Sequence, residues 1–199
     1  VTKKGLDIID SFFKGEFTAQ LDRDNSDYIY SSEKLINLSG KKYHQKRNHL
    51  ARLNDYKWEY RNISDNDFDD CISFSTLNYN YKNGENSQSS IAEQYAINTY
   101  FNYFHELGLK GGIIIINDKI AAMTIGEKLN SNTFCVHIEK ADTRYQGIYV
   151  GINNSFAKSA ASDCKFINRE EDLGIEGLRR SKLSYHPEFI LEKYEIIFS

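Results

Sequence analysis

One stretch of the sequence is strongly basic and could bind phosphates. Six lysines and arginines, and no acidic residue, lie between Glu33 and Asp55. At about 100° per residue, Lys42, Gln45, His49 and Arg52 fall within an arc of ~80° on one helix face. Such a face attracts the phosphates of a tRNA, a lipid headgroup or a nucleotide, because binding them releases counterions and because arginine and lysine bind phosphate directly. A solvated helix face is the alternative interpretation. The residues predicted to bind the polyanion are Lys41, Lys42, Lys46, Arg47, His49 and Arg52.

A histidine and a glutamate lie two residues apart in a segment with the pattern of a β-strand. His137 and Glu139 belong to the run from Thr133 to Lys140. Because side chains alternate along a strand, we expect both on one face of the sheet. A paired imidazole and carboxylate could relay a proton from an attacking amine, which predicts a catalytic pair. A hydrogen-bonded pair with a purely structural role is the alternative.

Three consecutive carboxylates, residues 170–172, precede a helix that carries Arg179, Arg180 and Lys182. The helix dipole favours acids before a helix and bases near its end, so helix capping is one explanation of the pattern. The other is that the run holds a catalytic carboxylate, for which Asp172 is the candidate.

The composition limits the class of protein. The 199 residues are 40% hydrophobic and carry a formal net charge of -3, which excludes a disordered chain and a globally basic nucleic-acid binder. The longest apolar run, residues 111–116, is far shorter than the ~20 residues needed to span a bilayer, and no signal segment opens the chain. We therefore expect a cytoplasmic protein, with a position peripheral to the membrane as an alternative.

Other catalytic and metal-binding patterns are absent from the sequence. There is no Gly-x-Ser-x-Gly elbow, Walker loop or His-Glu-x-x-His motif. The spacing of Cys71, Cys135 and Cys164 matches neither a disulfide framework nor a zinc site. We predict three buried thiols that form no disulfide, and no metal site.

Apolar periodicity and turn residues predict the elements that position these groups. In the first quarter of the chain we expect helices over Gly5–Phe13, Ser32–Leu38 and Lys41–Leu53, and two short strands, Phe17–Leu21 and Tyr28–Tyr30, separated by the turn-rich residues 22–27.

From residue 55 onward the same signals predict alternating strands and helices. Strands are expected at Tyr56–Ile63, Gly112–Ile116, Lys119–Lys128, Thr133–Lys140 and Glu188–Phe198, with an extended piece at Lys165–Asn168. Helices are expected at residues 68–79, at 90–108 after a capping pair Ser90/Glu93, at Gln146–Ala161 and at Ile175–Leu183, with a loop at Asn80–Ser87. The middle three strands would form a meander.

This order of elements over residues 55–199 resembles the GNAT acyltransferase fold. Three segments resemble, more specifically, a family of uncharacterised proteins grouped with the C-terminal domain of phosphatidylglycerol lysyltransferase. They are Tyr30-Ser31-Ser32-Glu33-Lys34-Leu35 with residues 38–43 and 46–49, His137-Ile138-Glu139-Lys140-Ala141, and Asn168-Arg169-Glu170-Glu171-Asp172-Leu173-Gly174 continuing into residues 177–185.

The resemblance implies an α/β (α+β) fold in which helices flank a mixed central sheet with an antiparallel meander. Members of the family are built as two GNAT-like halves and are related more distantly to Fem-type peptidoglycan aminoacyltransferases. On this basis residues 1–38 would be the C-terminal remnant of a preceding GNAT-like half, residues 39–54 a basic connecting helix, and residues 55–199 the GNAT-like domain. The preceding half would be a partner within the same protein.

Two further candidate sites follow from the resemblance. In GNAT proteins that use acetyl-CoA, a Gln/Arg-x-x-Gly-x-Gly/Ala loop at a helix N-terminus binds the pyrophosphate. Arg144, Gln146 and Gly147 lie at the matching place, although Tyr149 stands where a small residue normally lets the backbone approach phosphate. In Fem-type relatives a lysine steadies the negative charge that develops on an ester carbonyl, and by resemblance Lys182 has this role.

We therefore expect an acyl- or aminoacyltransferase that moves its group from tRNA or a thioester to an amine or hydroxyl. Aminoacyl-tRNA is favoured over acyl-CoA as the donor, because the basic helix is present and the loop for CoA is altered. The alternative is a catalytically inactive GNAT-like module that recognises tRNA, an anionic lipid or a protein partner.

Overall fold

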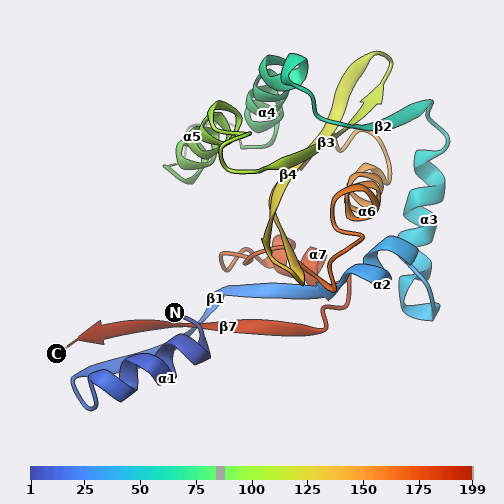
Figure 1. Ribbon diagram of the computed structural model, residues 1–199. Coiled ribbons are helices and arrows are strands. Elements are labelled where there is room, and N and C mark those ends of the chain that lie inside the picture. The colour runs from blue at the N-terminus through green and yellow to red at the C-terminus, as the bar shows by residue number, and fades with distance from the viewer. Residues whose placement is uncertain (84–87, 199) are drawn as a thin grey trace. The chain divides into compact units, whose positions relative to one another are not determined.

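The structure is a computed structural model that describes residues 1–83 and 88–198 (Figure 1). The chain divides into two compact units. Unit 1 combines Val1–Ser31 with Asn168–Ser199, and unit 2 is Ser32–Ile167.

An antiparallel sheet forms the centre of unit 2. Its strands β2 (Trp58–Asn62), β3 (Lys110–Ile116), β4 (Lys119–Asn130) and β5 (Thr133–Ala141) are neighbours in that order, and each pair is antiparallel. The β3–β4 turn places Asn117 and Asp118 at φ 52° and 60°, the two left-handed residues that the tightest hairpins require. The predicted three-stranded meander is therefore confirmed.

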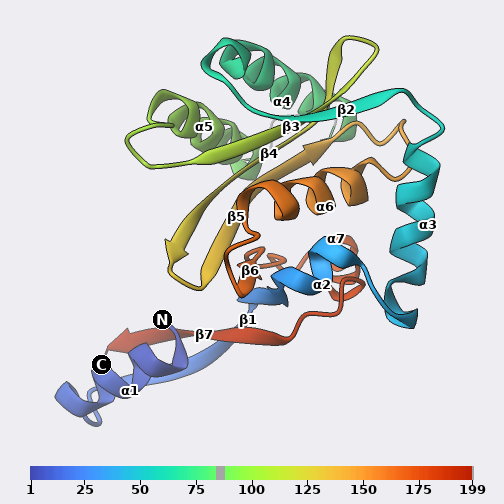
Figure 2. The same ribbon diagram turned by 45° about the vertical axis from the view of Figure 1, so that its right-hand side comes forward.

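Helices cover both faces of this sheet (Figure 2). The helices α4 (Phe68–Asn83) and α5 (Gln88–Asn102) pack on one face around buried Ile97, Phe101 and Met123. On the other face α6 (Ile148–Ala160) packs around Ile114 and Ile152. The mixed α/β class with helices flanking the sheet is confirmed.

Two short helices and α3 lie beside α6 within unit 2. They are α2 (Ser32–Asn37), the 3-10 turn η1 (Lys41–Tyr43) and α3 (His44–Leu53), and both α2 and α3 contact α6. The Asn154 amide nitrogen of α6 donates to the carbonyl oxygens of Leu35 and Ile36, each at 2.7 Å. Leu53 is fully buried against α6, so one face of α3 is anchored and the other faces solvent.

The helices α4 and α5 differ from their predicted bounds. The backbone is helical to Asn83 and again from Gln88, so the predicted loop at 80–87 is wrong over its first four residues, and its residues 84–87 lie outside the described part of the chain. The predicted start at the Ser90/Glu93 pair is wrong as well, since residue 90 is inside α5. Polar residues are tolerated inside an α-helix, because they cost little in helix propensity. The polar composition of residues 80–87 therefore did not mark where α4 ends and α5 begins.

Unit 1 is a long two-stranded ribbon, and a helix precedes each of its two strands along the chain. The strand β1 (Phe17–Ser31) pairs antiparallel with β7 (Phe189–Phe198), and α1 (Lys3–Phe12) contacts β7. The helix α7 (Glu176–Leu183) belongs to the same unit, and the short strand β6 (Phe166–Asn168) spans the boundary between the two units. The prediction of two separate strands in residues 17–30 is wrong, because β1 is one continuous strand. Its pairing with β7 shifts register between Asp22 and Asp27, so the predicted turn residues form an irregularity within the strand.

The two units do not follow the predicted boundaries at residues 38 and 54. The pairing of β1 with β7 places the N-terminal 31 residues and the C-terminal strand in one unit. That residues 1–38 are the remnant of a preceding GNAT-like half stays a prediction.

Across residues 1–83 and 88–198, none of the helices combines the length and the apolar character that crossing a bilayer would require.

One buried carboxylate fixes the start of α4 to β2. Asp67 accepts two hydrogen bonds of 2.6 Å from the Arg61 guanidinium and two more from the amide and hydroxyl of Ser64, which completes a capping box. These hydrogen bonds hold the pKa of Asp67 well below its usual range, and the bonds from Arg61 are the largest cause.

The depressed pKa of Asp67 predicts a loss of stability in acid. In the unfolded chain an aspartate has a pKa of about 3.9, so the stabilisation is present above about pH 4 and is lost as pH falls toward the folded pKa. We expect Asp67→Asn to be less stable than wild type at pH 7, and the difference in unfolding free energy to shrink as pH falls from about 5 to 3. Urea unfolding at several pH values measures this difference. Asp69→Asn, two residues further along the chain and exposed, is the control, and a difference for Asp67→Asn that is independent of pH would contradict the expectation.

Candidate functional site

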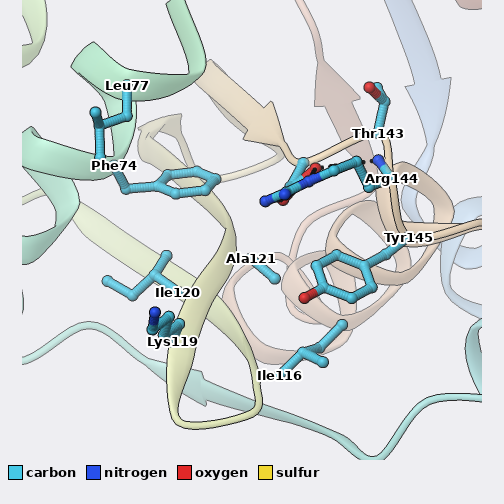
Figure 3. A pocket seen from close by; sticks show the side chains of 10 residues that line it. Phe74, Leu77, Ile116, Lys119, Ile120, Ala121, Thr143, Arg144 and Tyr145 are labelled. Atoms are coloured by element: carbon cyan, nitrogen blue, oxygen red, sulfur yellow. Dashed lines mark hydrogen bonds and ion pairs between the residues drawn. The ribbon is translucent and has the colours of Figure 1, made fainter. Parts of the chain in front are cut away.

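A pocket of about 260 Å³ opens at one end of the unit 2 sheet (Figure 3). It lies where the β3–β4 hairpin and the end of β5 meet α4. Figure 3 shows the Phe74 ring and the Arg144 side chain approaching each other across the opening, with Tyr145 on the side of Arg144. The lining residues are Phe74, Leu77, Ile116, Lys119, Ile120, Ala121, Asp142, Thr143, Arg144 and Tyr145.

The floor of this pocket is apolar and its rim is charged. The Arg144 guanidinium donates to the Asp142 carboxylate, with Nη2–Oδ2 at 2.6 Å and Nε 3.0 Å from both oxygens. Asp142 is in turn tied to the sheet, because its amide donates to the Ala121 carbonyl oxygen at 2.8 Å. The side chain of Arg144 is still 73% exposed, and Lys119 is exposed as well. The pocket therefore suits an apolar or aromatic group that is joined to an anion.

The loop predicted to bind the pyrophosphate of CoA is covered by α3. Gly147 has φ +82°, and a Cβ built on it would lie 1.9 Å from the carbonyl oxygen of His49. The preceding amide, of Gln146, donates to the Tyr56 hydroxyl at 3.5 Å. The close approach that glycine permits at this helix start is therefore used by the backbone of α3. That Arg144, Gln146 and Gly147 bind a pyrophosphate stays a prediction.

The basic segment presents most of its predicted residues to solvent. Lys41, Lys42, His49 and Arg52 are exposed, and Lys46 is half-buried. Arg47 also has a structural role, since its Nη1 donates to the carbonyl oxygens of Leu38 at 2.5 Å and Gly40 at 2.8 Å. A shallow groove runs over this surface, lined by Lys41, Lys42, His44, Gln45 and Arg47. We call the exposed faces of η1 and α3 the basic surface.

His137 and Glu139 do not share a face of the sheet, so that part of the sequence prediction is wrong. The β4–β5 pairing shifts register from Ile125↔Ile138 to Gly126↔Val136, which leaves His137 as an extra residue in a β-bulge. The His137 ring stacks on Tyr100 of α5 at 5.4 Å, whereas Glu139 accepts 3.1 Å from Asn153 of α6 on the opposite face. A bulge breaks the period-two alternation on which the prediction depended.

The bulge instead brings His137 between two residues that the sequence analysis did not assign to a site. Its Nε2 lies 3.1 Å from the Glu127 carboxylate, and its Nδ1 lies 3.7 Å from Sγ of Cys135. Glu127 is the direct cross-strand partner of Cys135 in the ladder. The Cys-x-His spacing on one strand was a visible signal, but the position of Glu127 depends on the pairing of β4 with β5.

Asp172 of unit 1 is a fully buried acceptor of several hydrogen bonds. It accepts from Arg179 at 2.7 and 2.8 Å, from the Tyr28 hydroxyl at 2.5 Å and from the Gly174 amide at 2.9 Å. The bonds from Arg179 are the largest cause that holds the pKa of Asp172 well below its usual range. A carboxylate with this many donors is a poor proton acceptor, so its placement favours an anchor of α7 over the predicted catalytic role.

Lys182, on α7, is also largely buried. Its ammonium group donates to the carbonyl oxygen of Arg169 and lies 5.8 Å from the centroid of the Tyr28 ring. Its own carbonyl oxygen accepts from the Tyr30 hydroxyl at 2.8 Å. These contacts fix the cation in unit 1, while His137 and Glu139 belong to unit 2.

Comparison with known proteins identifies relatives over most of the chain. A conserved protein of unknown function from Bacteroides thetaiotaomicron has a solved structure that is 39% identical, with a TM-score of 0.92 over 100% of this chain and 68% of that one. A curated but uncharacterised protein of Mycoplasmoides gallisepticum is 26% identical over 183 residues, which is 91% of this chain. The chain spans 59% of the length of that relative.

More distant structures share the fold. L-PGS from Bacillus licheniformis has a TM-score of 0.67 at 10% identity, over 99% of this chain and 65% of that one. A tandem GNAT protein from the clavulanic acid biosynthesis pathway has a TM-score of 0.52 at 6% identity, over 100% of this chain and 59% of that one. The GNAT-like fold is thereby confirmed. The family described as phosphatidylglycerol lysyltransferase, C-terminal, matches residues 1–197, and the chain belongs to that family.

Proposed function

We propose that this protein transfers an aminoacyl group from aminoacyl-tRNA to an amine or hydroxyl acceptor. Family membership and the GNAT-like fold support acyl transfer as the reaction class. The choice of tRNA over CoA as the donor depends on the contact between α3 and the start of α6.

The observation that carries this choice is the position of Gly147 beneath the backbone of α3. The His49 carbonyl oxygen lies against Gly147 in the loop that would hold a CoA pyrophosphate, and a carbonyl oxygen repels a phosphate, which supports a donor other than CoA. Lys42 of η1 and His49 and Arg52 of α3 are exposed on the outside of this segment. The cations on the outside of η1 and α3 therefore favour a donor with many phosphates, such as tRNA. The contact of α3 with the Gly147 loop disfavours CoA.

The pocket at the end of the unit 2 sheet supports the same donor class. A terminal nucleotide of single-stranded RNA offers a flat base and a phosphate, and bases stack on aromatic side chains while arginine binds phosphate. Phe74, Tyr145 and Arg144 provide these groups around one opening (Figure 3). Lys182 is proposed to stabilise the oxyanion that forms when a nucleophile attacks the ester carbonyl, as a fixed buried cation suits a developing negative charge.

The proposal predicts a clear difference between two donors. Calorimetry at about 50 mM salt is expected to detect binding of aminoacyl-tRNA, with an affinity that falls steeply as salt rises, because counterions are released from phosphate. Acetyl-CoA is expected to bind weakly, with a dissociation constant above the micromolar range, because the loop is covered. A third measurement uses vesicles of anionic lipid. It shows whether the polyanion that this protein binds is a lipid surface or tRNA.

Two results would contradict the proposal. Micromolar or tighter binding of acetyl-CoA would reverse the choice of donor. Binding of tRNA without any transfer of the aminoacyl group, tested with a panel of amine and hydroxyl acceptors, would favour the alternative of a binding module.

A further inference from the structure

We infer that Cys135 is a nucleophile that accepts the acyl group covalently, activated by His137 and Glu127. The inference rests on the proposed acyl transfer and adds a step to it. Cys135 and Glu127 face each other across the β4–β5 ladder, and the bulge places His137 beside both.

The hydrogen bonds of the imidazole orient it for this role. The Glu127 carboxylate, 3.1 Å from Nε2, can only accept, so it favours the tautomer with the proton on Nε2. The lone pair of Nδ1 then points toward the thiol, whose Sγ is 3.7 Å away. A nucleophile, a base and a carboxylate that orients the base form the arrangement that activates cysteine and serine nucleophiles in unrelated folds.

The surroundings hold this geometry in place. The Tyr100 ring stacks on the imidazole with an interplanar angle of 21°, which limits rotation of the ring. Gly126 lies under the bulge, where a Cβ would come within 2.1 Å of the Cys135 carbonyl oxygen. The bulge therefore depends on a residue without a side chain.

The other two cysteines lack this activation and serve as internal references. Burial raises the pKa of the Cys71 thiol to about 12. Burial and the neighbouring Asp163 carboxylate raise the pKa of the Cys164 thiol. Because the thiolate is the reactive form, these two side chains should react slowly near neutral pH.

In the proposed step the acyl group passes from the donor ester to the sulfur of Cys135 and then to the acceptor. The Cys135 thiol gives its proton to Nδ1 of His137, and the sulfur attacks the carbonyl carbon of the donor ester. The C–O bond breaks, the leaving hydroxyl oxygen takes the proton from the imidazolium, and a thioester on Cys135 remains. An acceptor amine or hydroxyl then attacks the thioester, the C–S bond breaks, and the proton of the acceptor passes through His137 to restore the thiol.

Site-resolved alkylation of the whole chain tests the activation. Because only 3% of Cys135 is exposed, the probe is the small electrophile iodoacetamide, used at about pH 6.5, where an ordinary thiol is hardly ionised. Peptide mass spectrometry is expected to show Cys135 modified about tenfold or more faster than Cys71 and Cys164. The variant His137→Gln is expected to remove this advantage, and Cys164→Ser is the matched control that leaves it unchanged. Equal rates for the three cysteines in wild type would overturn the inference.

A generic acyl ester tests the covalent step independently of tRNA. Incubation with p-nitrophenyl acetate is expected to leave an acetyl thioester on the Cys135 peptide that hydroxylamine removes. Selective alkylation without such an adduct would overturn the covalent step. Since neither probe contains tRNA or CoA, failure of tRNA binding would count against the proposed donor alone, and failure of these probes against the nucleophile alone.

Discussion

Replacing Lys42 and Arg52 together by alanine is expected to weaken tRNA binding by on the order of a hundredfold at about 50 mM salt, if each residue neutralises one phosphate. The salt dependence should flatten at the same time, because each lost contact removes about 0.7 to 0.9 from the slope of the logarithm of affinity against the logarithm of salt concentration. Both side chains are exposed, so the fold should be unaffected. Fluorescence anisotropy with labelled tRNA over a series of salt concentrations measures affinity and slope together.

The control for this experiment removes two cations outside the basic surface. Lys3→Ala with Lys4→Ala changes the net charge by the same amount, and both residues are exposed on α1 of unit 1. Arg47 is left unchanged because it holds the carbonyl oxygens of Leu38 and Gly40, so its loss would alter the turn before α3. Equal weakening by both double variants would mean that the attraction is diffuse and that the basic surface is a solvated helix face.

Replacing Asp172 by asparagine is expected to lower the unfolding free energy at neutral pH by about 3 kcal/mol. Removing one partner of a buried ion pair usually costs about 3–5 kcal/mol, and the low end applies because Arg179 is partly exposed and keeps a second partner, Asp24, at 2.6 Å. The same change also weakens the acceptor for the Tyr28 hydroxyl. Urea unfolding followed by circular dichroism measures the loss.

Asp24→Asn is the matched control, since it removes the other carboxylate on the same guanidinium. Asp24 is 59% exposed, and an exposed ion pair contributes roughly 0 to 1 kcal/mol. A similar loss for both variants would show that burial of Asp172 adds nothing to the interaction. A small loss for both would show that α7 is held by its other contacts.

The local sequence determined the meander of unit 2 and the position of the basic surface. The Asn117-Asp118 turn lies between two runs of β-forming residues, and this short-range signal was enough to predict the meander. The absence of acids between Glu33 and Asp55 likewise predicted a cationic helix, because the charge of an exposed face depends on composition and helical period alone. Three short segments were sufficient to indicate the family to which the chain belongs.

Only the tertiary structure decided which of the candidate groups meet. The bulge at His137 depends on the register between β4 and β5, and a shift of one residue sends a side chain to the other face of a sheet. For this reason the sequence pointed to Glu139 as the partner of His137, while the folded chain brings Glu127 and Cys135 to it. The contact of Gly147 with α3 and the pairing of β1 with β7 are of the same kind, since they join residues about 100 and 170 positions apart in the chain. Local propensity carries no information about such contacts, because packing between distant segments selects them only when the whole chain folds.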